Sequence, residues 1–182
     1  MKIAVFGRGH LGGGLADLWE HAGHEVMRFG RDGGNVSDAE VVVIAVPGEV
    51  IHQALKKLSG LQGKTVIDCT NRYGVDPPAG FASNAEFVKS VSGGPTAKAF
   101  NTNFASLFGQ LGESRVKPSN LWCGDEDARE VVELLNRDAG YEPVNTGTIE
   151  NSSAQERIVD VIFAISKELG FYVYRFAQID QL

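Results

Sequence analysis

The sequence has few cysteines and no long apolar run, and each shortage excludes a class of protein. Its 182 residues include only Cys69 and Cys123, which form no C-x-x-C pair. Two cysteines are too few for a disulfide framework, so we expect a reducing, cytoplasmic setting. The longest apolar run, residues 41–47, is far below the ~18 residues of a membrane span. The N-terminus reaches Gly7 before the ~7–15 apolar residues of a signal peptide.

Positive charge is also in the minority. The chain has 17 Lys and Arg against 23 Asp and Glu, for a net charge of −6, so no broad basic face is expected for nucleic acid or anionic lipid. Its 43% hydrophobic and 22% charged residues are typical of a globular protein. The length fits one domain and leaves little room for a separate substrate domain.

Short β-branched runs alternate with amphipathic stretches along the chain, which is typical of a mostly parallel α/β sheet. The expected strands cover residues 3–6, 25–29, 41–46, 65–68, 96–100, 121–123, 142–145 and 171–176. The expected helices cover residues 10–22, 49–58, 83–91, 126–138 and 151–168. Residues 30–40, between the second and third strands, contain no amphipathic helix, so this crossover is predicted to lack the usual one.

The pattern Gly-x-Gly-x-x-Gly occupies residues 7–12. The pattern alone is weak evidence in a chain with 22 glycines, but here it follows a buried strand and opens a helix, as a dinucleotide-binding turn does. Gly7 would permit the tight turn, Gly9 would bring the backbone to a pyrophosphate at positive φ, and Gly12 would let the helix pack on the sheet. The alternative is a glycine-rich turn without a ligand.

The end of the second strand decides which dinucleotide is expected. An NAD site places Asp or Glu there for the ribose hydroxyls. This chain instead has Arg31 directly after Gly30, and an arginine suits the 2′-phosphate of NADP. Asp32 is the rival, since it could bind the ribose one position later. We therefore favour NADP over NAD.

Few other residues indicate chemistry. His52 follows the third strand by one helical turn and could face a nicotinamide or lie on a solvated helix face. Cys69 ends the fourth strand, where ligands gather in open parallel sheets, or it is an inert buried thiol. No spacing indicates a metal site or a catalytic triad, so we assign no catalytic residue and no metal ligand.

In several segments the chain resembles the NADP oxidoreductases that depend on coenzyme F420, a deazaflavin. The same fold occurs in STEAP-type ferric reductases. The segment Lys98-Ala99-Phe100-Asn101-Thr102 is the most specific of the matching segments and the glycine turn the least. Together the segments extend over nearly the whole chain, at residues 7–12, 30–32, 45–47, 68–71, 98–102, 123–126 and 147–151.

This resemblance implies a role for each matching position. The cofactor site would comprise Gly7, Arg8, Gly9, His10, Leu11, Gly12, Gly30, Arg31, Ala45, Val46, Pro47, Asn71 and Ala99. Within it, residues 8–11 would hold the pyrophosphate, Arg31 the 2′-phosphate, and Asn71 and Ala99 would lie near the nicotinamide. Asn101 and Thr102 would border the acceptor pocket. The family moves hydride directly between nicotinamide and deazaflavin, so catalysis would consist of positioning and exclusion of water.

We therefore expect one Rossmann-type, doubly wound NAD(P)-binding domain over residues 1–182. Residues 1–102 would form the nucleotide-binding core, and residues 103–182 would complete the sheet and the acceptor cleft. The leading hypothesis is an NADPH-dependent oxidoreductase with a flavin-like or deazaflavin acceptor. The alternatives are a non-catalytic NADP-binding redox sensor and a reductase of small imines or hydroxyacids. The expected partner is a small-molecule or cofactor acceptor, with no nucleic acid and no membrane, and any self-assembly would be a homodimer.

Overall fold

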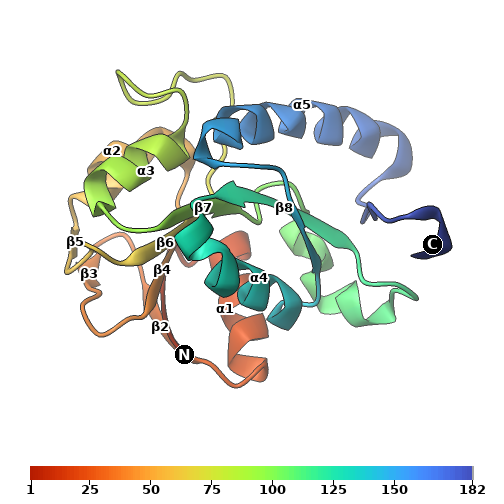
Figure 1. The fold of residues 1–182 in the computed structure, drawn as a ribbon, viewed down its shortest axis with the longest axis horizontal. Helices are drawn as coiled ribbons and strands as arrows, with labels where there is room; N and C mark the ends of the chain where they lie inside the picture. The colour runs from red at the N-terminus through yellow and green to blue at the C-terminus, as the bar shows by residue number, and fades with distance from the viewer. Residues whose placement is uncertain (182) are drawn as a thin grey trace.

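A seven-stranded sheet runs through the computed structural model, which describes residues 1–181 (Figure 1). The sheet order is β2-β1-β4-β6-β7-β8-β9. Its strands are β1 (Lys2–Phe6), β2 (Glu25–Phe29), β4 (Val41–Ile44), β6 (Thr65–Asp68), β7 (Thr96–Ala99), β8 (Ser119–Gly124) and β9 (Glu142–Asn145). The first five in chain order are mutually parallel, whereas β8 is antiparallel to β7 and parallel to β9. This confirms the predicted Rossmann-type, mostly parallel sheet.

Helices cover both faces of the sheet, as a doubly wound fold requires. They are α1 (His10–His21), α2 (Ile51–Leu55), α3 (Asn84–Ser92), α4 (Arg129–Asp138) and α5 (Ser152–Leu169). Figure 1 shows α1 and α4 below the sheet and α3 and α5 above it. Short 3-10 turns lie at Gly48–Val50, Ala105–Glu113, Glu126–Ala128, Ile149–Asn151 and Ile179–Gln181.

Alternating side chains of the central strands supply two separate cores. Ile3 and Val5 of β1 pack in the core that contains Leu15 of α1 and Leu135 of α4. Their neighbours Ala4 and Phe6 pack in the other core, with residues of α2 and α3. Because successive strand residues point to opposite faces, a continuous apolar run such as β1 is what a sheet covered on both sides needs.

The crossover from β2 to β4 lacks a helix, as predicted. In its place a two-residue strand, β3 (Gly34–Asn35), pairs with another short strand, β5 (Leu58–Ser59), in a parallel arrangement. The sequence analysis did not foresee this small second sheet. It joins the crossover to the segment that follows α2, and this brings residue 57 beside residues 33 and 34.

Several expected elements differ from the structure. The strand expected at 121–123 extends over Ser119–Gly124, and the helix expected at 126–138 begins with a 3-10 turn, Glu126–Ala128, before α4. The third strand ends at Ile44 rather than residue 46, and the helix expected at 49–58 is a 3-10 turn followed by the short α2. The strand expected at residues 171–176 is absent. That segment lies beside the start of β8, where Ser119 donates to the carbonyl of Tyr174 at 2.8 Å, but it forms no ladder. Among the described residues, no helix is long and apolar enough to cross a membrane.

Candidate functional site

A cavity of about 850 Å³ opens at the carboxyl ends of β1, β2, β4 and β6. In the sheet, β2 lies on one side of β1 and β4 lies on the other side, so the direction in which strands are added reverses next to β1. Open α/β sheets bind ligands at such a switch point. The lining residues are Phe6, Gly7, Arg8, Gly9, His10, Leu11, Gly30, Arg31, Ala45, Val46, Pro47, Gly48, Val50, Gln53, Ala54, Lys57, Cys69, Thr70, Asn71 and Tyr73.

The three glycines of the turn have different physical roles. Gly7 adopts φ +128°, and a Cβ there would lie 2.1 Å from the carbonyl oxygen of Ala45. A Cβ on Gly12 would lie 2.2 Å from the carbonyl oxygen of Gly7, so this glycine permits close packing of α1 on the turn. Gly9 has φ −74° and ψ −173°, which corrects the expected positive φ. A Cβ on Gly9 would meet no protein atom within 4 Å.

Open space above Gly9 is what a bound pyrophosphate needs. Gly9 is the N-cap of α1 and has no side chain to cap the helix. The first N–H groups of a helix lack partners within the helix, and its N-terminus attracts anions. The turn therefore offers donors and space at the same point of the cavity.

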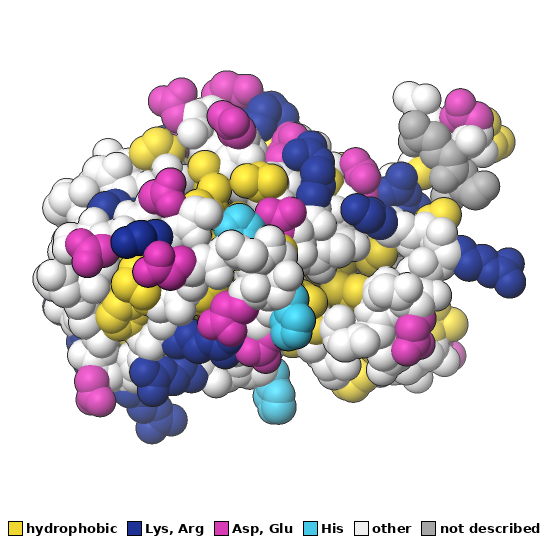
Figure 2. Space-filling model, turned by 90° about the horizontal axis from the view of Figure 1, so that it is seen from below, with side chains coloured by type: hydrophobic (Ala, Val, Ile, Leu, Met, Phe, Trp, Pro, Cys, Tyr) yellow, Lys and Arg dark blue, Asp and Glu magenta, His cyan; other side chains and the backbone are white. Residues whose placement is uncertain are grey.

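Three cationic residues line the end of the cavity beside β2: Arg8, Arg31 and Lys57. The side chain of Arg8 lies across Gly30, whose Cβ would be 3.6 Å from the Arg8 guanidinium carbon, and it donates to the carbonyl of Arg28 at 2.8 Å. Asp32, the rival ribose ligand, does not line the cavity, and neither does any other acidic residue that the structure describes. In a chain of net charge −6, basic side chains still gather locally, as the lower left of Figure 2 shows.

The remaining predicted residues fall into two groups. Most of them line the cavity: Gly7, Arg8, Gly9, His10, Leu11, Gly30, Arg31, Ala45, Val46, Pro47 and Asn71. The cavity lining does not include Gly12, Ala99, Asn101 or Thr102. Ala99 is fully buried in the core that contains Trp19. Thr102 is buried, and its hydroxyl shares a 2.6 Å hydrogen bond with the Tyr174 hydroxyl. Their predicted proximity to nicotinamide or acceptor therefore stays a prediction.

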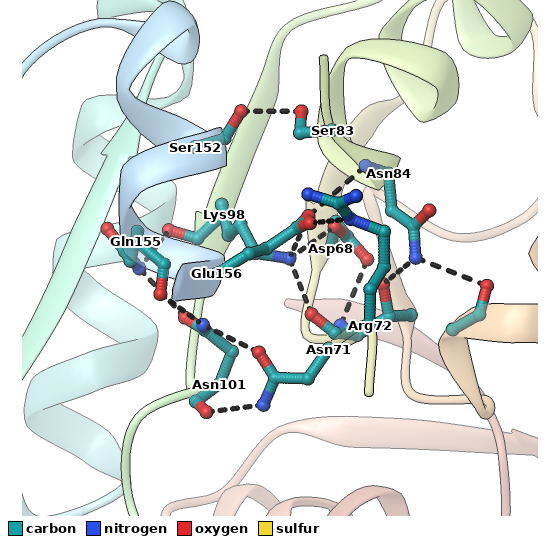
Figure 3. Close-up of polar contacts among 12 residues, drawn as sticks. Asp68, Asn71, Arg72, Ser83, Asn84, Lys98, Asn101, Ser152, Gln155 and Glu156 are labelled. Carbon is teal, nitrogen blue, oxygen red and sulfur yellow. Dashed lines mark hydrogen bonds and ion pairs between the residues drawn. The ribbon is translucent and has the colours of Figure 1, made fainter. Parts of the chain in front are cut away.

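A buried ionic cluster lies behind the cavity wall (Figure 3). Lys98 on β7 is completely buried, and its Nζ lies 2.7 Å from Oδ2 of Asp68 and 3.1 Å from Oε1 of Glu156. Glu156 comes from α5 and also pairs with Arg72, which follows β6. Two cations thus face two carboxylates. Burial alone would lower the pKa of Lys98, but its attraction to Asp68 and Glu156 outweighs burial and raises that pKa.

This cluster fixes the end of β6, which forms part of the cavity wall. Lys98 also donates to the carbonyl of Thr70. Next along the chain, the Asn71 carboxamide is held on both sides: its Nδ2 donates to the Asn101 carbonyl at 2.7 Å, and its Oδ1 accepts from Asn101 Nδ2 at 2.9 Å. Gln155 on α5 in turn donates to Asn101 Oδ1 at 2.9 Å. Asn71 therefore forms a fixed part of the cavity wall, and Asn101 holds it in place from behind through these two hydrogen bonds.

Sequence reasoning missed the ionic cluster and Lys57. A signal for the first was present, since Lys98 lies in a strand flanked by Ala97 and Ala99 and a buried cation needs a carboxylate partner. No signal pointed to Glu156 as the second partner, because it comes from a helix far along the chain. Lys57 was missed because its place depends on the β3–β5 pairing.

Neither cysteine presents a reactive thiolate. Cys69 lines the cavity but is buried, and burial raises the pKa of its thiol well above the usual value. Burial likewise raises the pKa of Cys123 to about 11. His52 is exposed, packs near Phe87 with ring centroids 5.6 Å apart, and lies outside the large cavity. The inert-thiol and solvated-helix interpretations are therefore favoured.

Comparisons with known proteins find similarity to NADP oxidoreductases. A family profile described as "NADP oxidoreductase coenzyme F420-dependent" matches residues 30–72, which include Arg31 and the cavity-lining ends of β4 and β6. A crystal structure of a protein from Arthrobacter sp. FB24, proposed to be an F420-dependent NADP reductase, superposes with a TM-score of 0.79 at 25% identity. It covers 98% of this chain and 100% of that one. The chain is similar to the F420-dependent NADP oxidoreductases, in sequence over residues 30–72 and in fold over nearly its whole length.

Two further proteins are similar to parts of this chain or of its fold. The metalloreductase STEAP3 of Rattus norvegicus is 28% identical over 152 residues, which is 78% of this chain, and the chain spans only 31% of that protein. An imine reductase from Aspergillus terreus, solved with NADPH4, superposes with a TM-score of 0.65 at 14% identity. It covers 92% of this chain, whereas 62% of the reductase is covered. At that identity the likeness shows the fold alone. The resemblance expected from the sequence is confirmed.

Proposed function

We propose that this relative of the F420-dependent NADP oxidoreductases binds NADP(H) and moves hydride between it and a flavin-like or deazaflavin acceptor. One observation carries the proposal: the cavity at the glycine turn has Arg8, Arg31 and Lys57 at its β2 end and no acidic lining residue among those described. An NAD site would place a carboxylate at that end. A cationic end instead suits the 2′-phosphate of NADP.

The residues of the chain would act by binding and positioning. The N–H groups at the start of α1 would hold the pyrophosphate above Gly9, and Arg31 would pair with the 2′-phosphate. The buried cluster behind Thr70 and Asn71 would keep the opposite wall of the cavity rigid. Bound NADPH would supply the hydride. No side chain needs to act as acid, base or nucleophile, because the catalytic contribution is orientation and exclusion of water.

Arg31→Ala should weaken NADPH binding and leave NADH binding nearly unchanged. A charge-assisted hydrogen bond is worth ~1.5–3 kcal/mol, which corresponds to roughly 10- to 150-fold in affinity. Isothermal titration of both nucleotides measures this, with Arg115→Ala as the control, because Arg115 is exposed and does not line the cavity. Equal weakening of both nucleotides would show that Arg31 does not read the 2′-phosphate.

His52→Ala and Cys69→Ala should each retain most of the transfer rate. The loss of a general acid or base costs ~10²–10⁴-fold, and we expect each variant to lose far less than that. Single-turnover oxidation of bound NADPH by a flavin or deazaflavin, which accepts the hydride, gives the rate. A loss beyond about a thousandfold with NADP binding intact would contradict transfer by positioning alone and would favour a reaction that needs a protein proton donor.

Steady-state NADPH oxidation against a panel of acceptors tests the proposed function. The panel comprises flavins, deazaflavins, quinones and imines. We expect turnover with a flavin or deazaflavin and slower turnover with NADH. Turnover with imines alone would instead establish a small-substrate reductase. Tight NADP binding with no turnover on any acceptor would establish a redox sensor.

A further inference from the structure

We propose that Lys57 is a specificity-determining residue that reads the 2′-phosphate of NADP together with Arg31. The inference rests on the proposed function, because it concerns the same nucleotide site. It assigns a role to a residue that lies 26 positions from Arg31 in the chain and follows α2, outside the glycine turn and the end of β2.

The missing crossover helix is what brings Lys57 to this corner. With no helix after β2, the segment after α2 packs directly on the crossover through the β3–β5 pair. The N–H of Gly34 donates to the carbonyl of Lys57 at 3.0 Å. Gly33 adopts φ +72°, and a Cβ there would lie 2.1 Å from the Lys57 carbonyl oxygen. The two adjacent glycines therefore permit this close approach.

The side chain of Lys57 lies against the residue that is expected to bind the phosphate. Its Nζ donates to the backbone carbonyl of Arg31 at 2.7 Å, and both residues line the cavity. An ammonium has three donors, and this is the one hydrogen bond found for it among the described residues. Further donors remain for a phosphate oxygen.

The charges at this corner lack anionic partners within the described chain. None of Arg8, Arg31 and Lys57 takes part in an ion pair there. Arg28, on the same strand end, differs: its guanidinium pairs with Asp17 and Glu20, each at 2.7 Å. Three unpaired cations around one end of a cavity are complementary to a dianionic phosphate.

The test is isothermal titration of the full chain with NADP⁺ and NAD⁺ in three forms: unmodified, Lys57→Met and Lys56→Met. Lys56 is the matched control, since it is the adjacent lysine, is exposed and does not line the cavity. We expect Lys57→Met to weaken NADP⁺ by about tenfold or more, to change NAD⁺ by less than about twofold, and Lys56→Met to change neither. Lys57→Arg should restore most of the NADP⁺ affinity.

The outcomes separate this inference from the proposed function. If the unmodified protein prefers NADP⁺ but Lys57→Met weakens both nucleotides equally, or neither, Lys57 is not a 2′-phosphate ligand and the proposed function stands. If the unmodified protein does not prefer NADP⁺, both proposals are wrong. Lys57→Gln provides a second variant, and its thermal midpoint should match that of Lys56→Met.

Discussion

Replacing Lys98 with methionine is expected to lower the free energy of unfolding by about 3–5 kcal/mol. Methionine fills much of the same space but removes the ammonium, so Asp68 is left in the core without the cation that lies 2.7 Å away. Glu156 still has Arg72. In a chain of this size 1 kcal/mol shifts Tm by about 2–4 °C, so the variant should melt about 6–20 °C lower.

Two further variants show whether the burial of the Lys98–Asp68 ion pair causes the loss of stability. Lys2 pairs with Glu25 at 3.8 Å, with both side chains at least half exposed, and Lys2→Met should change stability by less than about 0.5 kcal/mol. Adding Asp68→Asn to Lys98→Met should recover about 1 kcal/mol or more, because it removes the unpaired carboxylate. If Lys98→Met melts like Lys2→Met, the cluster does not stabilise the fold as described.

Valine at position 9 is expected to abolish NADP binding without unfolding the protein. A Cβ on Gly9 meets no protein atom within 4 Å, and φ −74° with ψ −173° is accessible to valine. The side chain would project into the space proposed for the pyrophosphate, so affinity should fall by more than about 100-fold, or about 2.8 kcal/mol. Titration with NADP⁺ and a thermal melt of the same sample provide both readouts.

Valine at position 12 should instead lower the stability of the protein, because its Cβ would lie 2.2 Å from the Gly7 carbonyl oxygen. Overpacking of this kind costs about 1–3 kcal/mol or more in stability. Gly13→Ala is the neutral control, because a Cβ there meets only the Arg8 carbonyl at 3.6 Å. Normal NADP binding by a folded Gly9→Val variant would show that the turn is not the phosphate site.

Local sequence patterns predicted most of the fold. Short, mostly apolar runs placed β1, β2 and β6 to within a residue, and the absence of an apolar stripe in residues 30–40 predicted the missing crossover helix. The sequence pattern did not reveal that β8 runs antiparallel to β7, because a buried strand has the same run of apolar residues whether it is parallel or antiparallel to its neighbour. Nor could it exclude a strand at residues 171–176, since their state depends on whether a neighbouring strand edge pairs with them.

The candidate site was predictable where it is continuous in sequence. The glycine turn, the end of β2 and the end of β4 were all identified from their positions after strands, and they do line one cavity. Lys57 was not, because its position depends on contacts of the crossover rather than on any local motif. Ala99 and Asn101 lie behind the wall instead of on it, since their strand end is covered by α1 on one side and α5 on the other.

The most direct test of hydride transfer is a single-turnover reaction of the unmodified protein with oxidised coenzyme F420 and NADPH deuterated at nicotinamide C4, on one face in one sample and on the other face in a second. Nuclear magnetic resonance of the product then locates the label. We predict deuterium bound to C5 of the reduced deazaflavin, transferred from one face of the nicotinamide and more rapidly from NADPH than from NADH. Reduced deazaflavin without deuterium at C5 in both samples, or transfer as rapid from NADH as from NADPH, would contradict the account.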